Sequence, residues 1–354
     1  MKISIVFHTS PRVAGGGTKI IYEYANFLAA KGYLIQFQYM ANELWSRFHL
    51  PESIRRLLAR VSIFKRPNWF KLNSSIKKKA VFNVCDDTFD DADVVIATDV
   101  RTAVPVNSLS SCKGRKVYFI QDFENWSLPD AEVYRTYGLG MKNITVSKWL
   151  CEFVDQYSVE PSVCINNSIN TELFRVINPI EQRKKHTMAF HYRSAETKGC
   201  QYAIKVIEVL QSKYPDLSVE VVGIEDRPEN LPSCCNYHHR ITPEKVARIN
   251  NKVAIFICSS IKEGFGLPGL EAMACGCALA ASEYQGVSEY AIDKENALLS
   301  PIRDVDSMVK NVESLFDDEL RWKIARSGVN TAQLRSFIAS AERLENILTN
   351  RLSL

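Results

Sequence analysis

The sequence lacks any long hydrophobic run. No apolar stretch approaches eighteen residues, so none is long enough to cross a bilayer as a helix. The first residues, MKISIVFHTSP, also lack the apolar segment and the small-residue cleavage site of a secretory signal. These absences predict a cytoplasmic protein that is soluble or, at most, peripheral to a membrane.

Regular cysteine spacing is absent too. The ten cysteines are scattered over 354 residues, which excludes a small disulfide-bonded scaffold and indicates reduced thiols. The stretch CCNYHHR at 234–240 offers four zinc-ligand side chains, but neighbouring side chains of a strand point to opposite faces and do not converge. We therefore expect no metal and no cofactor, and we expect Cys275 and Cys277 to be core thiols.

Strands and helices alternate along the chain. A chain of this length is too large for one hydrophobic core, and the alternation predicts parallel strands joined by helices. We expect an α/β fold with a Rossmann-like domain at 1–180, a second at 181–335 and a terminal helix at 336–354 that crosses back to the first domain. The apolar runs are ISIVF (3–7), LIQFQYM (34–40), DVVIATD (93–99), KVYFIQD (116–122), NITVS (143–147), TMAFHY (187–192), LSVEVVG (217–223), VAIFICSS (253–260) and CALAAS (277–282).

The nonapeptide EGFGLPGLE at 263–271 has competing interpretations. Its glycines spell G-x-G-x-x-G between a strand and a helix, where backbone N–H groups favour phosphate, and Glu283 is the acidic residue that a dinucleotide site requires. That motif belongs to the opening strand of a domain, however, and Glu263 would place a carboxylate beside the pyrophosphate. The second interpretation assigns Glu263 to a sugar ring and Glu271 to a ribose diol. A surface loop with a glutamate near a helix N-terminus is the third.

The longer stretch EGFGLPGLEAMACGCALAASEYQGVSE resembles the nucleotide-sugar motif of glycosyltransferase family 4. Similar stretches follow the family in order along the whole chain. They are VAGGGTKIIYEYANFL (13–28), VSKWL (146–150), NNSINTELF (166–174) and RSAETKG (193–199). The resemblance implies retaining enzymes of the GT-B fold, in which two Rossmann-like domains face a shared cleft and the C-terminal helices pack back toward the first domain.

The resemblance also implies roles for individual residues. Arg193 and Lys198 match the cations that bind the donor diphosphate, Glu271 the ribose-binding glutamate and Glu263 the glutamate that faces the transferred sugar, while Gly16 approaches the phosphate from the first domain. Fixed cations and helix amides can stabilise a departing diphosphate without a metal or a side-chain nucleophile. The remaining expected donor contacts are Gly264, Phe265, Gly266 and Leu267.

One position departs from the family pattern. Members commonly carry a histidine at the end of the strand YFIQDFE, where Gln121 stands here. The surrounding FIQDFENW resembles members that transfer rhamnose from dTDP-rhamnose in the synthesis of bacterial cell-surface polysaccharides. Alternatives are a glucosyl- or mannosyltransferase that uses UDP- or GDP-sugars, a sugar-nucleotide epimerase and a non-catalytic nucleotide-binding scaffold. A further alternative is that Gln121 only satisfies hydrogen bonds at the end of its strand and has no role in donor binding. The acceptor-side candidates are Asp122, Glu124, His8 and Arg12.

The segment 47–79 is strongly basic. It holds ten Lys and Arg against one acid, Glu52, so it carries +9 in a chain whose net charge is +4. Nucleic acid is not an expected partner, because no recognised binding module accompanies the charge. An anionic membrane surface on the inner face of the cell membrane, where lipid-linked acceptors occur, is a candidate partner. The alternative is a helix docked on its own domain. Ile54, Leu57, Leu58, Val61 and Phe64 recur at helical spacing opposite Arg55, Arg56 and Arg60.

Overall fold

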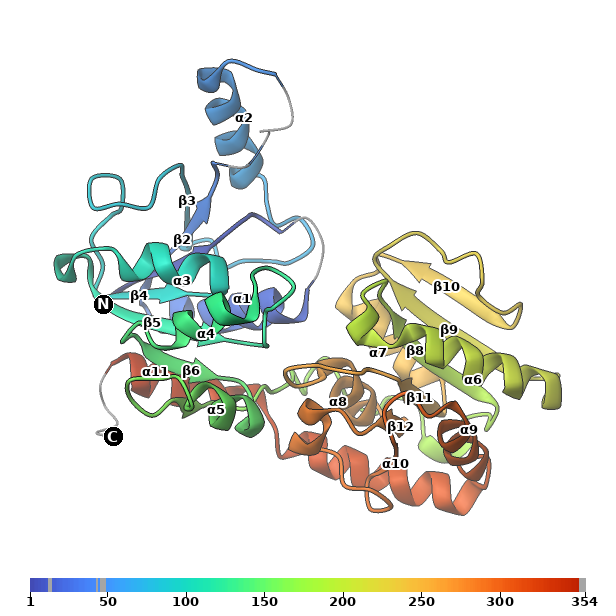
Figure 1. The fold of residues 1–354 in the computed structure, drawn as a ribbon. Coiled ribbons are helices and arrows are strands. Elements are labelled where there is room, and N and C mark those ends of the chain that lie inside the picture. Colours follow the sequence, from blue (N-terminus) through green and yellow to red (C-terminus); the bar gives the residue numbers. More distant parts are fainter. Residues whose placement is uncertain (12–14, 43, 45–48, 350–354) are drawn as a thin grey trace. The chain divides into compact units, whose positions relative to one another are not determined.

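Every paired strand runs parallel to its neighbours, in two separate sheets. The computed structural model describes residues 1–11, 15–42, 44 and 49–349. The chain divides into unit 1, residues 1–166 together with the residues from 341 onwards, and unit 2, residues 167–340 (Figure 1). The domain boundary expected near residue 180 thus falls inside unit 2.

Unit 1 contains a seven-stranded sheet in the order β3-β2-β1-β4-β5-β6-β7. Its strands are β1 (Lys2–Phe7), β2 (Leu34–Met40), β3 (Lys77–Val81), β4 (Val94–Ala97), β5 (Arg115–Ile120), β6 (Lys142–Thr145) and β7 (Val163–Cys164). Its helices are α1 (Gly16–Ala30), α2 (Glu52–Phe64), α3 (Val100–Asn107), α4 (Asp130–Tyr137) and α5 (Lys148–Val154), with a short 3₁₀ turn, η1 (Ser111–Lys113).

Unit 2 contains a six-stranded sheet in the order β10-β9-β8-β11-β12-β13. Its strands are β8 (Thr187–Tyr192), β9 (Ser218–Gly223), β10 (Cys235–His239), β11 (Ile255–Cys258), β12 (Ala278–Ser282) and β13 (Ala297–Ser300). Its helices are α6 (Cys200–Lys213), α7 (Pro243–Lys252), α8 (Leu267–Ala274), α9 (Val305–Ser314) and α10 (Asp318–Gln333). The 3₁₀ turns are η2 (Ile180–Gln182), η3 (Glu196–Lys198) and η4 (Gln285–Glu289). Helix α6 packs with α9, and α8 packs with α7 and α10, so helices cover both faces of the sheet.

Both sheets have the doubly wound order expected from the alternating pattern. In each, the chain adds strands on one side of the first strand and then changes direction, between β1 and β4 in unit 1 and between β8 and β11 in unit 2. Ligands of open parallel sheets bind at such a switch point, beyond the carboxyl ends of the strands. The loops that follow these four strands are therefore the places to look for a site.

Four strands lie outside the predicted apolar runs, and each is at an edge of its sheet; one of them is β10, with the polar sequence CNYHH. Strand β3 has the sequence KKKAV, and a charged sequence of this kind is typical of an edge strand, where it opposes further pairing. Strands β7 and β13 are two and four residues long and lie at the opposite edge of unit 1 and at an edge of unit 2. Short or charged edge strands carry too few apolar residues to show a clear pattern.

The last helix, α11 (Phe337–Leu348), returns the chain to unit 1. Its buried Glu345 accepts hydrogen bonds from Lys31 Nζ at 2.5 Å and from Tyr33 Oη at 2.9 Å. At the end of the helix, Arg115 Nη2 donates to the carbonyl oxygens of Ile347 and Leu348, as a cation at a helix C-terminus should. These contacts fasten the terminal helix to the loop between α1 and β2 and to the start of β5.

We predict that Glu345→Ala lowers the free energy of unfolding by about 1–3 kcal/mol, because Lys31 and Tyr33 lose their shared acceptor. Urea titration measures this quantity. Glu342→Ala is the matched control, since Glu342 is an exposed residue of the same helix. Equal unfolding midpoints for the two variants would contradict the role given to Glu345.

Candidate active site

The two central strands of unit 2 bring separate loops together at their carboxyl ends. The loop after β8 contains η3, and the loop after β11 contains the EGFGLPGLE motif. The backbone N–H groups of Ile261 and Lys262 both donate to the carbonyl oxygen of Thr197, at 2.8 and 3.1 Å. Ser259 Oγ donates to the carbonyl oxygen of Gly199 at 2.9 Å. Residues about sixty positions apart in sequence are thereby held in one local structure.

Gly199 makes this close approach feasible. Its φ of 59° lies in the left-handed region, and a Cβ at this position would lie 2.0 Å from the carbonyl oxygen of Ser259. Any other residue would therefore be strained and would also push the two loops apart. Gly199 ends η3 and begins α6, so it sets the position of the preceding Lys198.

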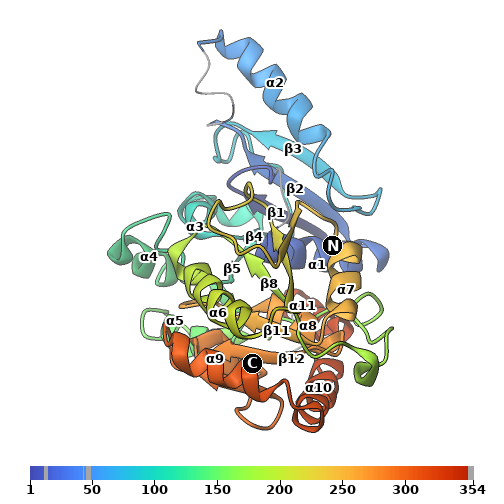
Figure 2. The same ribbon diagram turned by 90° about the vertical axis from the view of Figure 1, so that its right-hand side faces the viewer.

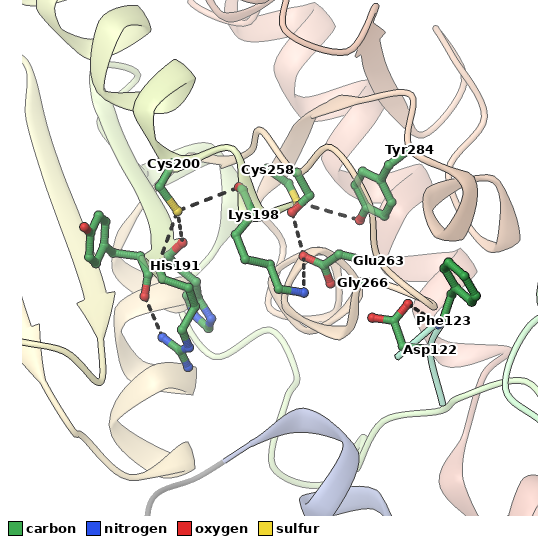
Figure 3. Close-up of polar contacts among 12 residues, drawn as sticks. Asp122, Phe123, His191, Lys198, Cys200, Cys258, Glu263, Gly266 and Tyr284 are labelled. Carbon is green, nitrogen blue, oxygen red and sulfur yellow. Dashed lines mark hydrogen bonds and ion pairs between the residues drawn. The ribbon is translucent and has the colours of Figure 1, made fainter. Parts of the chain in front are cut away.

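A cation, Lys198, and a carboxylate, Glu263, meet at this junction (Figure 3). Lys198 Nζ lies 3.6 Å from Glu263 Oε1, and Ser260 Oγ donates to the same oxygen at 2.6 Å. Arg193, directly after β8, is half-buried and donates from Nη1 to the carbonyl oxygen of Tyr192 at 2.7 Å. Within the described ranges no carboxylate pairs with Arg193. A guanidinium in this setting is suited to an anion.

The N-terminus of α8 begins beside Glu263 and is rigidly held. Gly266 has a φ of 92°, and a Cβ there would lie 2.1 Å from Tyr284 Oη. Tyr290 Oη donates to the carbonyl oxygen of Gly266 at 2.8 Å and lies 3.0 Å from Tyr284 Oη. In the first turn of α8, Pro268 has no N–H and the Gly269 N–H donates to the carbonyl oxygen of Gly266 at 3.1 Å, so the Leu267 N–H and the helix dipole are what favour a phosphate there.

The other expected site residues of the EGFGLPGLE motif are buried. Phe265 and Leu267 have buried side chains, and the Phe265 ring packs against Tyr290 with centroids 5.5 Å apart. Gly264 is also buried, so this part of the loop can reach a ligand only through its backbone. The carboxylate of Glu271, the fifth residue of α8, is buried as well. The structure thus brings Arg193, Lys198, Glu263 and α8 into one assembly within unit 2.

The dinucleotide interpretation of the glycine motif does not fit its place in unit 2. The motif follows β11, the fourth strand of the unit in chain order, whereas the opening strand-helix unit is β8 with α6. A carboxylate, Glu263, also lies at the mouth of the loop, where it is held by Lys198 and Ser260.

In unit 1, Gln121 directly follows β5 and contacts the start of α1. A Cβ at Gly17 would lie 3.0 Å from both Gln121 Nε2 and Oε1. Gln121 Oε1 is buried and has no hydrogen-bond partner among the described residues. Gly16, the first residue of α1, is exposed. The start of α1 and Gln121 thus lie together in unit 1.

A second polar group occupies the switch point of unit 1. His8, just after β1, has Nδ1 2.7 Å from Asp99 Oδ2, and Asp99 caps α3 by accepting from the N–H groups of Arg101 and Thr102. Glu124 Oε2 accepts from Val100 N–H, also in the first turn of α3, at 2.6 Å. Asp99 was missed from sequence, although an aspartate between a strand and a helix is a recognisable cap.

The remaining acceptor-side candidates are Asp122 and Arg12. Asp122 Oδ1 accepts from the backbone N–H of the adjacent Phe123 at 2.9 Å (Figure 3). Arg12 lies outside the described residues.

Burial raises the pKa of Glu124 to about 8, with a further contribution from the nearby Asp99 carboxylate. In an unfolded chain a glutamate has a pKa of about 4.3. Between these values the folded protein holds a proton that the unfolded chain releases, so stability falls as the pH rises through this range and changes no further above it.

We therefore predict that Glu124→Gln, which keeps an acceptor for Val100, removes this dependence. The melting temperature of the native protein should fall relative to that of the variant between about pH 5.5 and about pH 8.5. Thermal unfolding across this range checks the prediction. A difference that is constant with pH would contradict the raised pKa.

No metal site emerges from the described part of the chain, since three or more His, Cys, Asp or Glu side chains nowhere gather as ligands. In CCNYHHR, His238 contacts Glu220, whereas His239 contacts the carbonyl oxygen of Ile224. Cys275 and Cys277 are buried, as expected of core thiols. Nor does any helix in the described ranges have the length and apolarity needed to span a bilayer.

Comparison with known sequences finds a family match within unit 2. Residues 172–332 match the family model of the glycosyl transferases group 1. Over 131 residues the chain is 30% identical to an uncharacterized glycosyltransferase of Haemophilus influenzae, covering 34% of this chain and 36% of that protein. Over 197 residues it is 26% identical to the putative glycosyltransferase EpsD of Bacillus subtilis, covering 51% and 52% respectively. The chain spans about half or less of the length of these relatives.

Comparison with solved structures concerns the fold. The crystal structure of Anabaena HepE in complex with UDP-glucose superposes with a TM-score of 0.74 at 13% identity, covering 99% of this chain and 100% of that one. The expected GT-B fold of two Rossmann-like domains is confirmed. Residues 172–332 therefore match the glycosyl transferases group 1 model and lie within a chain of the two-domain GT-B fold.

Proposed function

We propose that this protein is a retaining glycosyltransferase. It moves a hexose, L-rhamnose from dTDP-rhamnose, to a glycan or lipid-linked saccharide in the synthesis of a cell-surface polysaccharide. The observation that carries the proposal is the assembly of Arg193, Lys198, Glu263 and the N-terminus of α8 at the switch point of unit 2, inside the group 1 domain.

The donor diphosphate binds at this assembly in the proposed mechanism. Arg193 has no competing carboxylate among the described residues, so its fork of donors can bind phosphate oxygens. Lys198 is held by Glu263 at 3.6 Å, a distance long enough for a diphosphate to compete for the ammonium. As the sugar–phosphate bond breaks, negative charge grows on the leaving diphosphate, and these cations and the N-terminus of α8 stabilise it more than they stabilise the ground state.

The glutamates receive the uncharged parts of the donor. Ser260 keeps one oxygen of Glu263 in place, so the carboxylate stays oriented toward a sugar when Lys198 turns to the phosphate. Glu271 accepts hydrogen bonds from the ribose diol. The departing phosphate takes the proton of the acceptor hydroxyl, which attacks the sugar from the same face. The chemistry proposed here requires no metal, cofactor or side-chain nucleophile.

Unit 1 supplies the acceptor side in this proposal. His8 is oriented by Asp99 and stays partly exposed, which suits a hydrogen bond to a saccharide hydroxyl. Gln121 and Gly16 approach the donor sugar and its phosphate. The protein acts in the cytoplasm, attached peripherally to the inner face of the membrane, and its partners are the nucleotide-sugar and the acceptor.

A UDP-glucose donor is the second candidate. HepE, which has the same fold, was crystallised with UDP-glucose, and its nucleotide would suit the same cations and helix N-terminus. The two donors differ at the sixth carbon of the sugar, which is a methyl group in rhamnose and carries a hydroxyl in glucose. A direct comparison of the two donors distinguishes them.

We predict that Arg193→Ala and Lys198→Ala each lower kcat by roughly 10²-fold or more, because the diphosphate loses a cation in the transition state. Glu271→Ala should mainly weaken donor binding. Steady-state kinetics and donor titrations measure these effects. Lys205→Ala, an exposed lysine of α6, is the matched control. Near-normal kinetics in all three site variants would reject the site.

We also predict that dTDP-rhamnose raises the melting temperature more than UDP-glucose or GDP-mannose does. A histidine at position 121 would lack a partner at a methyl group, whereas a glutamine can direct its amide elsewhere. An apolar surface around the methyl discriminates against a hydroxyl by only about 10²-fold, and Gln121→His should weaken the preference. If UDP-glucose or GDP-mannose competes better, the rhamnose assignment is wrong while the transferase proposal stands.

A further inference from the structure

Helix α2 lies at the outer edge of unit 1, beside the lysine-rich edge strand β3 (Figures 1 and 2). Within α2 only Ala59 and Ile63 are buried. They are four residues apart and so share one face of the helix. The guanidinium groups of Arg56 and Arg60 lie over the ring of Phe82, at 5.1 and 5.8 Å from its centroid. The helix is therefore attached to unit 1 by a narrow face.

The apolar stripe expected from the sequence lies on the other side. Ile54, Leu57, Val61 and Phe64 are 45%, 61%, 44% and 76% exposed. Their spacing of three, four and three residues places them in one stripe. At 3.6 residues per turn, this stripe lies roughly opposite Ala59 and Ile63. Helix α2 thus packs on its own domain, which is the alternative expected from the sequence, but it does so through Ala59 and Ile63 and leaves the apolar stripe exposed.

Positive charge borders the stripe. Arg60 and Lys65 lie on its two sides and are exposed. Exposed Lys71 and Lys77 follow in the same segment. The single acid of the segment, Glu52, is paired with Arg56 at 2.6 Å. A free carboxylate that would repel an anionic surface is thus absent from the described part of the segment.

The C-terminal end of α2 is held by a lysine of the neighbouring strand. Lys78 Nζ, on β3, donates to the carbonyl oxygens of Phe64 and Arg66 at 2.5 and 2.6 Å. This contact satisfies carbonyl groups at the C-terminus of α2 and so keeps the last turn helical. Phe64, the most exposed residue of the stripe, is thereby presented on an ordered turn.

We propose that α2 is an interfacial membrane helix, which lies flat on an anionic bilayer with its apolar stripe in the acyl boundary and its cations at the headgroups. This inference rests on the peripheral membrane attachment included in the proposed function, and it assigns that attachment to the exposed surface of α2. A stripe of large apolar side chains with cations along both edges is the pattern of helices that lie in the bilayer interface. The uncompensated positive charge matches anionic headgroups and favours this occupant over a second copy of the chain, which would carry the same charge.

The test is co-sedimentation of the full chain with vesicles of phosphatidylglycerol and phosphatidylcholine, against vesicles of phosphatidylcholine alone. The native protein should prefer the anionic vesicles. The double variant Leu57→Asn with Phe64→Asn should bind at least roughly tenfold more weakly, because two large side chains no longer leave water. Leu334→Asn is the matched control, since Leu334 is 88% exposed in unit 2. It should bind as the native protein does.

A second variant tests the contribution of the arginines of α2 to membrane binding. Replacement of Arg55, Arg56 and Arg60 by Ser should also weaken binding to anionic vesicles, and binding of the native protein should fall as salt is added. Binding that survives the Leu57 and Phe64 replacements unchanged, or that ignores salt, would overturn the proposal. Self-association of the native protein that these replacements abolish would also overturn it, by assigning the stripe to a second copy.

The donor site provides an independent readout. The Leu57 and Phe64 variant should keep the increase in melting temperature that dTDP-rhamnose, or UDP-glucose if that is the better donor, gives the native protein. Loss of vesicle binding with this increase intact supports the membrane helix. Loss of both in the same variant would overturn it, because the replacements would then have disturbed unit 1 as a whole.

Discussion

The parallel pairing of β8 with β11, tightened by the contact of Gly199 with Ser259, is the constraint on which the candidate site depends. The pairing places the ends of two strands side by side, and the absence of a Cβ at Gly199 lets the following loops touch. The carbonyl oxygen of Thr197 then joins them through two hydrogen bonds. Arg193 and Lys198 come from one loop and Glu263 and α8 from the other, so neither loop alone would form the anion site.

The electrostatics of the assembly favour a ligand that carries more than one negative charge. Glu263 neutralises part of the charge of Lys198, while Arg193 and the α8 N-terminus have no carboxylate of their own among the described residues. A single phosphate would satisfy one of these groups, whereas a diphosphate can reach several. The tyrosine pair behind Gly266 holds the helix N-terminus in place before a ligand arrives, so little reorganisation is needed on binding.

Much of this arrangement could be predicted from the sequence, because buried parallel strands are continuous apolar runs. The runs at β2 and β8 matched their strands residue for residue, and the glycine motif correctly indicated a loop followed by α8. Strand β3 was missed because three of its five residues are lysines, so it shows no apolar run. Asp99 was missed because a helix cap is a local feature whose contact with His8 depends on distant pairing. Helical spacing revealed the stripe of α2, but only tertiary contacts decide that Ala59 and Ile63 face the protein.

The most direct test of the central claim is a crystal structure of the protein with a nucleoside diphosphate. The diphosphate oxygens should lie within hydrogen-bond distance of Arg193, Lys198 and the Leu267 N–H at the start of α8, with the ribose at Glu271. A nucleotide bound elsewhere, or a diphosphate that contacts neither cation, would contradict this claim.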